Sequence, residues 1–492
     1  MSKHFLSVLP LLLVASCSTV GPDFEAPAQP AVDSYRMAGD IPRPEEVMLV
    51  QRQSVGLGWW KIFQSPEIDA LVDQALENSP TLDIADAALA RANASEGAVR
   101  GKGVPQADVT ASMGRERINT AAFGIKGFPS PTINLYSVGS AVSFDLDLFG
   151  KQKRRVENAR AHAEAEGYRT DAAYLTLTGQ VVVTAIRLAA LRSQLTELDE
   201  IIAGDRKTLD MIQRGVDAGG EPRAAINTSE AQLAEDEARR PPLLYQIDAT
   251  RHELALLVGK APPDWSAPDI ALTDIALPDN IPVSLPSELV RHRPDILAAE
   301  ADLHAATAAI GIAEADRYPD LSLDAAFAFA ALSPDELFQY ESSGWSVGPA
   351  VSLPLLRGGT LKARQQMVIA DAQAADARYR QTVLSAFIQI ADLFSAIARD
   401  QALIDAQSRA SNIAMENVRL ATVSYENGAG SLLSVIDAQR QAQRARLALV
   451  DAQAQLREDA ASIIVASGWS SMGEGPRDAG DLLPLRMQTS SP

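Results

Sequence analysis

The sequence predicts a mixed α+β fold that is mainly α, in which short amphipathic strands feed directly into very long helices. Residues 345–360 and residues 136–150 carry this prediction. In both stretches apolar residues alternate with small or polar ones until glycine ends the strand, and helical spacing then follows. The two copies lie 209 positions apart, with Ser137 matching Ser346. We therefore expect a tandem duplication with two strands in each half.

The first residues have the pattern of a signal peptide that ends at a lipoprotein cleavage site. Lys3 and His4 precede an apolar run over residues 5–14, which is too short to cross a membrane as a helix. Small residues then lead to Cys17, the single cysteine of the chain. We expect residues 1–16 to be removed and Cys17 to be acylated, the alternative being a chance cysteine at an ordinary cleavage site. No later run of about 18 uninterrupted apolar residues follows, so strands are the elements expected to cross a membrane.

Composition argues against nucleic-acid binding and against catalysis. The chain has 63 acidic and 44 basic residues, a net charge of −19, which would repel a phosphate backbone. The five histidines are scattered, and no glycine-rich phosphate loop or metal-ligand spacing occurs in the sequence. We expect no enzyme activity, no cofactor and no metal site.

Proline and glycine divide the chain into segments. We expect a lipidated, proline-rich arm over residues 17–64 and a first structural repeat over 65–260, made of a helix, a β-hairpin and a long helical hairpin. A proline-rich linker over 261–284 leads to the second structural repeat over 285–470. The polar residues 471–492 are expected to form a flexible tail.

Spacing within the repeats places the elements. In the first repeat we expect a helix over 67–99, strands over 107–113 and 136–148, a helix over 151–216 and a return helix over 223–258. Apolar residues recur every seven positions in the long helix, which predicts supercoiled packing over about 100 Å. Pro241 and Pro242 are expected to interrupt the return helix. The second repeat is expected to have strands near 321–329 and 345–355, a helix of about 65 residues from Leu361 and a return helix over 432–465.

The strand pattern restricts the architecture. Four strands are too few to close a membrane barrel, and an open sheet edge cannot lie in lipid. We therefore expect several chains to share one barrel, and their helices to form a second, longer tube. The alternation places small and acidic residues inside, which predicts that the barrel is a channel rather than a plugged barrel.

Several motifs together resemble the outer-membrane factors of tripartite efflux systems, in the TolC-type, NodT-like lipoprotein branch. They are the lipobox with Val20–Asp23, WWKIF at 59–63, Leu285–Ala306, RYPDLSL at 317–323, PLLRGG at 354–359 and SVIDAQR at 434–440. The resemblance covers nearly the whole chain from Cys17 to Trp469. It implies a homotrimer with a twelve-strand β-barrel in the outer membrane and its lipid, and a periplasmic α-helical barrel. It also implies two partners, a periplasmic adaptor protein and an inner-membrane transporter.

The resemblance also implies a periplasmic gate. Leu433 and Asp437 match a leucine and an aspartate that close the pore, and Tyr425 matches a tyrosine that ties the inner hairpin to its neighbour. Four glycines would form the hairpin tips that contact the adaptor: Gly215, Gly219, Gly428 and Gly430. The alternatives are a solvated helix charge for Asp437, heptad packing for Tyr425 and a turn requirement for the glycines. An arginine that the family has near Gly430 is absent, so no salt-bridge latch is expected there.

The resemblance implies that the protein is a passive outer-membrane exit duct for small molecules, served by an RND-type pump. A type I protein-secretion duct of the same architecture is one alternative. A periplasmic coiled-coil adaptor without a pore is another, but it would have no amphipathic strands.

Overall fold

The protein is described by a computed structural model. The described residues are 19–28, 34–35, 37, 49–51, 58–119, 122, 124, 127, 129–277, 281–283 and 286–468. The predicted signal peptide, Cys17 and the predicted tail lie outside them.

The chain comprises two compact units, and each takes segments from both predicted repeats. Unit 1 contains residues 1–27, 88–167 and 298–380, and unit 2 contains residues 28–87, 168–297 and 381–492. The repeat boundaries inferred from the sequence stay a prediction.

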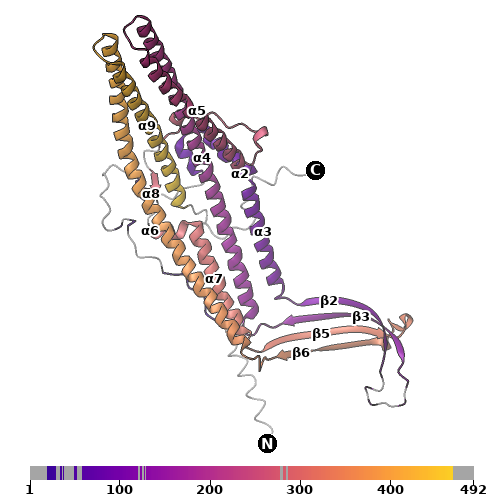
Figure 1. The fold of residues 1–492 in the computed structure, drawn as a ribbon. Helices are drawn as coiled ribbons and strands as arrows, with labels where there is room; N and C mark the ends of the chain where they lie inside the picture. Colours follow the sequence, from indigo (N-terminus) through magenta and orange to yellow (C-terminus); the bar gives the residue numbers. More distant parts are fainter. Residues whose placement is uncertain are drawn as a thin grey trace. The chain divides into compact units, whose positions relative to one another are not determined.

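Unit 1 contains a four-stranded antiparallel sheet (Figure 1). Its strands are β2 (Gln106–Arg117), β3 (Thr132–Asp145), β5 (Asp320–Ala331) and β6 (Ser343–Ser352), in the order β2-β3-β5-β6. Strand β2 extends four residues beyond the predicted end at Met113, because Gly114 to Arg117 continue the ladder opposite Leu135 to Thr132. Within the described residues, the outer edges of β2 and β6 have no strand partner.

The strand register gives the sheet two chemically different faces. Residues that are paired across strands lie on the same face. One row joins Val109, Ser140, Phe327 and Trp345, and the next joins Thr110, Gly139 and Ala328. Apart from Ser140 and the residues at the strand ends, apolar residues therefore occupy one face across all four strands, and small or polar residues occupy the other. The alternation predicted from the sequence is confirmed in every strand.

Gly139 shows how tightly the small-residue face is packed. A methyl group built on Gly139 would lie 2.8 Å from Cβ of Ala328, whereas the same addition at Gly114 meets nothing within 4 Å. Gly139→Ala is therefore expected to lower the free energy of unfolding by about 1–3 kcal/mol through overpacking. Gly114→Ala, on the same face, should change the free energy of unfolding much less, and thermal unfolding of the two variants compares them. Equal effects would show that strand propensity, rather than contact with Ala328, decides the result.

The helices follow the predicted order with two corrections. They are α2 (Pro66–Asn78), α3 (Pro80–Gly101), α4 (Lys151–Asp217), α5 (Ala224–Leu257), α6 (Pro286–His292), α7 (Pro294–Ala315), α8 (Thr360–Glu426) and α9 (Leu432–Ala466). The single helix predicted over 67–99 is wrong, because Ser79 is extended, with ψ at 121°, as residues before proline tend to be. The interruption predicted at Pro241 and Pro242 is also wrong, since α5 continues through both. Both prolines are exposed, so water can reach the carbonyls that lose an amide partner.

Unit 2 is built around the packed helices and the aromatic segment WWKIF. Trp59, Trp60 and Phe63 form a short 3₁₀ helix (Trp59–Phe63) and are buried, as a packing anchor should be. The indole nitrogen of Trp59 donates a hydrogen bond to the Thr178 hydroxyl over 3.2 Å. Two short parallel strands, β1 (Leu49–Gln51) and β4 (Ile281–Val283), join the arm to the linker and were not predicted.

Three helices contain an 18-residue window that is long and apolar enough to cross a membrane, judged by length and composition: α4, α7 and α8. None of these windows is an uninterrupted apolar run, so the sequence pattern did not indicate them. The chain itself buries 72% of the α4 window but only 28% of the α8 window. Large apolar residues such as Leu384, Ile388 and Ile413 are accordingly exposed on α8. This apolar surface is therefore not covered by the chain itself.

Candidate functional site

The hairpin-tip glycines of unit 2 are of two kinds. Gly219 and Gly428 have φ of +75° and +72°, which is left-handed backbone that favours glycine, and a side chain at either would meet nothing within 4 Å. Gly215 and Gly430 are close-packed instead. A methyl group on Gly215 would lie 3.1 Å from Cγ of Glu221, and one on Gly430 would lie 2.8 Å from Oγ of Ser424. Turn geometry thus accounts for one pair and packing for the other.

Tyr425 joins the two hairpin tips within one chain. Its ring packs against a cluster of Ile212, Leu432 and Ile436, to which α4 and α9 both contribute. Burial raises the pKa of the Tyr425 hydroxyl, and its hydrogen bond to Glu221 raises it further. Packing and a polar tie therefore coexist at this residue.

The first turns of α9 have a buried face and an exposed face. Leu432, Val435 and Ile436 are buried, whereas Leu433 is 69% exposed and Asp437 is exposed one turn later. The Gln441 side-chain amide donates to the Asp437 carboxylate over 2.9 Å. The two residues predicted to form a gate thus share the free face of α9, which is the face that could line a passage.

Two further residues on this face were missed in the sequence. Gln441 and Arg444 are exposed and follow Asp437 by four and seven positions. This helical spacing places them on the same stripe as Leu433 and Asp437. Their spacing of four and seven positions from Asp437 is the signal that could have identified them.

A buried acidic cluster links α4, α5 and α9. Asp205 and Asp236 are buried, Asp236 forms an ion pair with Arg239 over 3.3 Å, and the side-chain amide of Gln232 donates to Asp236 over 2.5 Å. Arg440 of α9 donates to Gln232, and Gln443 donates to Asp236 over 3.5 Å. Burial, followed by the hydrogen bond and negative charge of Asp236, raises the pKa of Asp205 to about 7, which Arg440 only partly offsets.

We expect the free energy of unfolding to fall as pH rises from about 4 to about 7. Over this range the folded chain keeps a proton on Asp205 that an unfolded aspartate, with a pKa of 3.8, has released. Asp205→Asn should therefore stabilise the protein at pH 7.5 by roughly 1–2 kcal/mol and flatten the pH profile. Thermal unfolding at several pH values measures both.

Asp400, whose pKa burial and Asp459 raise to about 7, contributes a slope of the same sign, so some slope should remain in Asp205→Asn. Asp210→Asn is the control, because Asp210 forms an exposed pair with Arg214. A slope unchanged by Asp205→Asn would contradict the proton kept on Asp205.

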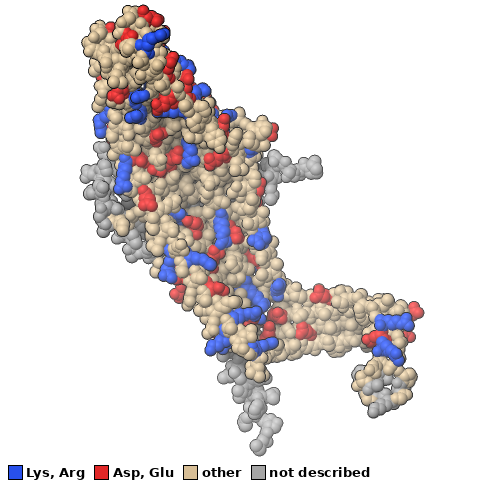
Figure 2. All heavy atoms as spheres, viewed as in Figure 1, with Lys and Arg blue, Asp and Glu red and all other residues tan. Residues whose placement is uncertain are grey.

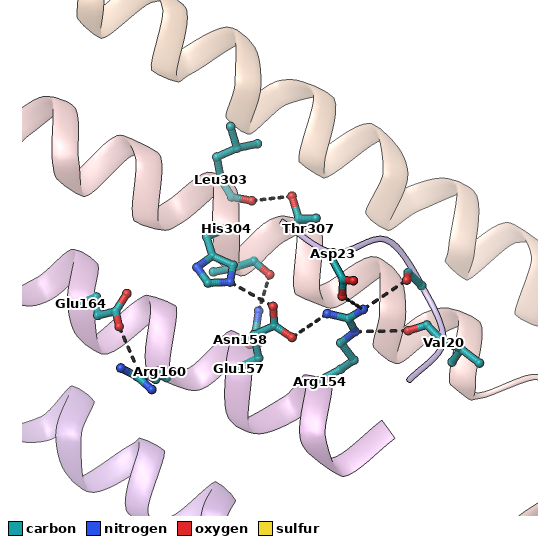
Figure 3. A network of polar contacts seen from close by, with 12 residues as sticks. Val20, Asp23, Arg154, Glu157, Asn158, Arg160, Glu164, Leu303, His304 and Thr307 are labelled. Carbon is teal, nitrogen blue, oxygen red and sulfur yellow. Dashed lines mark hydrogen bonds and ion pairs between the residues drawn. The ribbon is translucent and has the colours of Figure 1, made fainter. Parts of the chain in front are cut away.

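A polar network in unit 1 holds the N-terminal arm against α4 and α7 (Figure 3). The Arg154 side chain is only 3% exposed and forms ion pairs with Asp23 and Glu157, each over 2.7 Å. It also donates to the carbonyl oxygens of Val20 and Gly21 over 3.2 and 3.1 Å. All its partners except Glu157 belong to the arm.

The network extends to α7 through His304. Nε2 of His304 lies 3.0 Å from Oε1 of Glu157, and the ring of Phe24 stacks on the imidazole at 4.4 Å. Burial raises the pKa of Glu157, but hydrogen bonds from Arg154 and His304 outweigh it, so that the pKa is lowered from its ordinary value. Glu157 is therefore held as a carboxylate between two donors.

Close backbone contact completes the docking of the arm. Gly21 has φ at +89°, and a methyl group on it would lie 2.4 Å from Cα of Gly311. The amide of Val20 donates to the carbonyl of Phe149, and Lys153 donates to the Thr19 hydroxyl. Residues 19–24 are thus fixed at the junction where β3 ends and α4 begins.

Comparison with known proteins finds relatives along nearly the whole chain. The profile of the outer membrane efflux protein family matches residues 71–260 and 285–468. The chain is 30% identical to Nodulation protein T of Rhizobium leguminosarum bv. viciae over 473 residues, which cover 94% of this chain and 92% of that protein. It is 27% identical to the Solvent efflux pump outer membrane protein SrpC of Pseudomonas putida, over 89% of this chain and 92% of SrpC.

A solved structure of the outer-membrane channel OprN has the same fold. Its TM-score is 0.83 at 27% identity, and the match covers 92% of this chain and 99% of the OprN chain. The mainly helical, TolC-type fold predicted from the sequence is confirmed.

Proposed function

The chain belongs to the outer membrane efflux protein family, and on this premise we propose that it is the exit duct of a tripartite, RND-type efflux system. Small molecules would pass through it from the periplasm to the exterior without the duct itself consuming energy. The observation that carries the proposal is the two-faced sheet with two open edges, joined directly to helices α4 and α8 of 67 residues each.

The open edges support a homotrimer. Strands β2 and β6 run in opposite directions, since each successive pair in the sheet is antiparallel. The β6 edge of one chain can therefore pair with the β2 edge of the next in the same antiparallel way. Three chains would give twelve strands and leave no edge exposed to lipid.

The two faces support a hydrated passage. The face with Val109, Phe327 and Trp345 suits lipid, and the face with Asp108, Ser143 and Asp324 suits water. No chemistry is needed from these residues, in keeping with a family of outer-membrane efflux proteins rather than enzymes.

The docked arm supports acylation of Cys17. Thr19 and Val20 contact Lys153 and Phe149, at the end of a strand that would cross the membrane. Cys17 is only two residues from Thr19. Acyl chains on Cys17 would therefore reach the inner leaflet of the outer membrane beside the barrel.

The gate and the partners complete the proposal. In a trimer, the free face of α9 would form a ring of Leu433 and a ring of Asp437 around the axis, which would narrow the passage and favour cations. The tips near Gly219 and Gly428 are unobstructed and would meet a periplasmic adaptor that connects the duct to an inner-membrane transporter.

The test is planar-bilayer conductance of the full-length protein, with its mass determined in the same detergent. A trimer with small, cation-selective openings would support the duct. A monomer without conductance would overturn it. Export of a fluorescent dye by cells, compared with secretion of a large polypeptide, then separates small-molecule efflux from type I protein secretion.

A further inference from the structure

The apolar face of β2 ends in two arginines. Val109 and Met113 lie on this face, and Arg115 and Arg117 follow at the same alternation. Asn134 of β3 is paired with Arg115, and Thr132 with Arg117, so these four side chains share one face. We call them the arginine cluster. Glu116, which lies between the arginines, belongs to the opposite face.

The register fixes the level of the arginine cluster relative to the apolar band. The last apolar row contains Met113, Tyr136 and Ala331, and the cluster occupies the next two rows. From Phe144 to Tyr136 the band extends along β3 for about 26 Å, at about 3.3 Å per residue. With strands tilted by about 40°, as in outer-membrane barrels, this corresponds to a height of about 20 Å, close to the lipid-facing band of about 25 Å.

The direction of β2 identifies which leaflet the cluster meets. Strand β2 follows α3 and leads to the loop over 118–131, so Arg115 and Arg117 lie at its far end from the helices. If the helices are periplasmic, as the proposed function requires, this end is at the cell surface. The cluster then lies at the headgroup level of the outer leaflet.

The positive charge of the cluster is not neutralised within the described part of the chain. The protein has a net charge of −19, yet neither arginine has an ion-pair partner among the described residues. Both are exposed, and their Cα atoms are about 6.6 Å apart, as for residues i and i+2 of a strand. Figure 2 shows that the sheet is mostly free of charged residues along its length, with charges gathered at its ends.

We propose that the arginine cluster binds the phosphate group of a phosphorylated glycolipid in the outer leaflet. Two guanidinium groups on one face can form paired hydrogen bonds to phosphate oxygens, which a single lysine cannot match. The Asn134 amide and the Thr132 hydroxyl add neutral donors beside them. The acyl chains of the same lipid would lie on the apolar row below. This inference rests on the proposed function, because it needs this face to meet the outer leaflet.

The experiment measures lipid binding to the full-length trimer in a neutral detergent by native mass spectrometry. Diphosphoryl lipid A is compared with the same lipid after its phosphates have been removed. We expect about tenfold tighter binding of the phosphorylated lipid, and loss of that preference in Arg115→Gln/Arg117→Gln. Arg399→Gln/Arg409→Gln, which removes two exposed charges from α8, is the control and should keep the preference.

Two results would overturn the proposal. One is equal binding of the two lipids to the unmodified protein, a comparison that needs no variant to fold. The other is dissociation of the arginine variant into monomers, which would show that the arginines pair with acidic residues of a neighbouring chain. A trimer that conducts but shows no phosphate preference would reject this inference alone, whereas absence of a conducting trimer would reject the proposed function.

Discussion

Replacing Leu433 and Asp437 together by alanine is expected to raise single-channel conductance severalfold and to weaken selectivity for cations. Both side chains lie on the free face of α9, while Leu432 and Ile436 hold the opposite face in the core. Truncation should therefore widen a passage without disturbing packing. Three carboxylates around one axis attract cations and repel anions, so their removal should also change which ions pass.

The single variants separate the two contributions. Leu433→Ala should mainly raise conductance, because it removes bulk, and Asp437→Asn should mainly reduce selectivity, because it removes charge at nearly constant size. Leu403→Ala/Asp405→Ala on α8 serves as a composition-matched control, since both residues are exposed and lie away from the tips. Planar-bilayer recordings of trimers of confirmed mass provide the measurement. Conductance unchanged in the double variant would remove these residues from the gate.

The strands and long helices could be predicted because their signals are local and repeated. Gly358 and Gly359 separate two periods so clearly that the predicted helix start at Leu361 is one residue from the observed start at Thr360. The heptad residues Val181 and Leu188 are fully buried, as supercoiled packing requires. Patterns of this kind depend only on neighbours within a few residues.

The errors came from proline, whose effect depends on its surroundings. Ser79 is extended, and Pro80 begins a new helix. The proline itself therefore marks a break that helical periodicity alone does not show. Pro241 and Pro242 lie on an exposed face of α5, where lost hydrogen bonds can be replaced by water. All three prolines are exposed, so the two cases differ in the residue before the proline: Ser79 is extended, whereas Arg240 remains helical within α5.

The candidate gate and the arm-docking network differ in how far apart their residues lie in the sequence. Leu433, Asp437, Gln441 and Arg444 are related by helical spacing, so periodicity alone can group them. Arg154 is 131 positions from Asp23 in the sequence, and Glu157 is 147 positions from His304. Nothing in local spacing joins residues so distant, and only the folded chain reveals that Arg154 is buried.

Replacing Arg154 by methionine is expected to release the N-terminal arm and to lower the free energy of unfolding by roughly 2–3 kcal/mol. Methionine keeps the apolar stem but removes every donor from a side chain that is 3% exposed. Glu157 would lose one of its two donors, and the carbonyls of Val20 and Gly21 would lose their partner. Asp23 is 91% exposed and can bind water instead, so most of the cost comes from Glu157 and from the two backbone carbonyls that lose their donor.

Arg160→Met is the matched control for this experiment. Arg160 lies on the same helix and pairs with Glu164 over 3.0 Å, but its side chain is 60% exposed, so its loss should cost about 0–1 kcal/mol (Figure 3). Thermal unfolding of the two variants, with the mass of each determined before heating, compares them directly. If Cys17 is acylated as proposed, the Arg154 variant should also loosen the link between its acyl chains and the proposed barrel. Equal unfolding temperatures for the two variants would mean that Gly21 and Phe24 hold the arm without Arg154, and that the network serves another purpose.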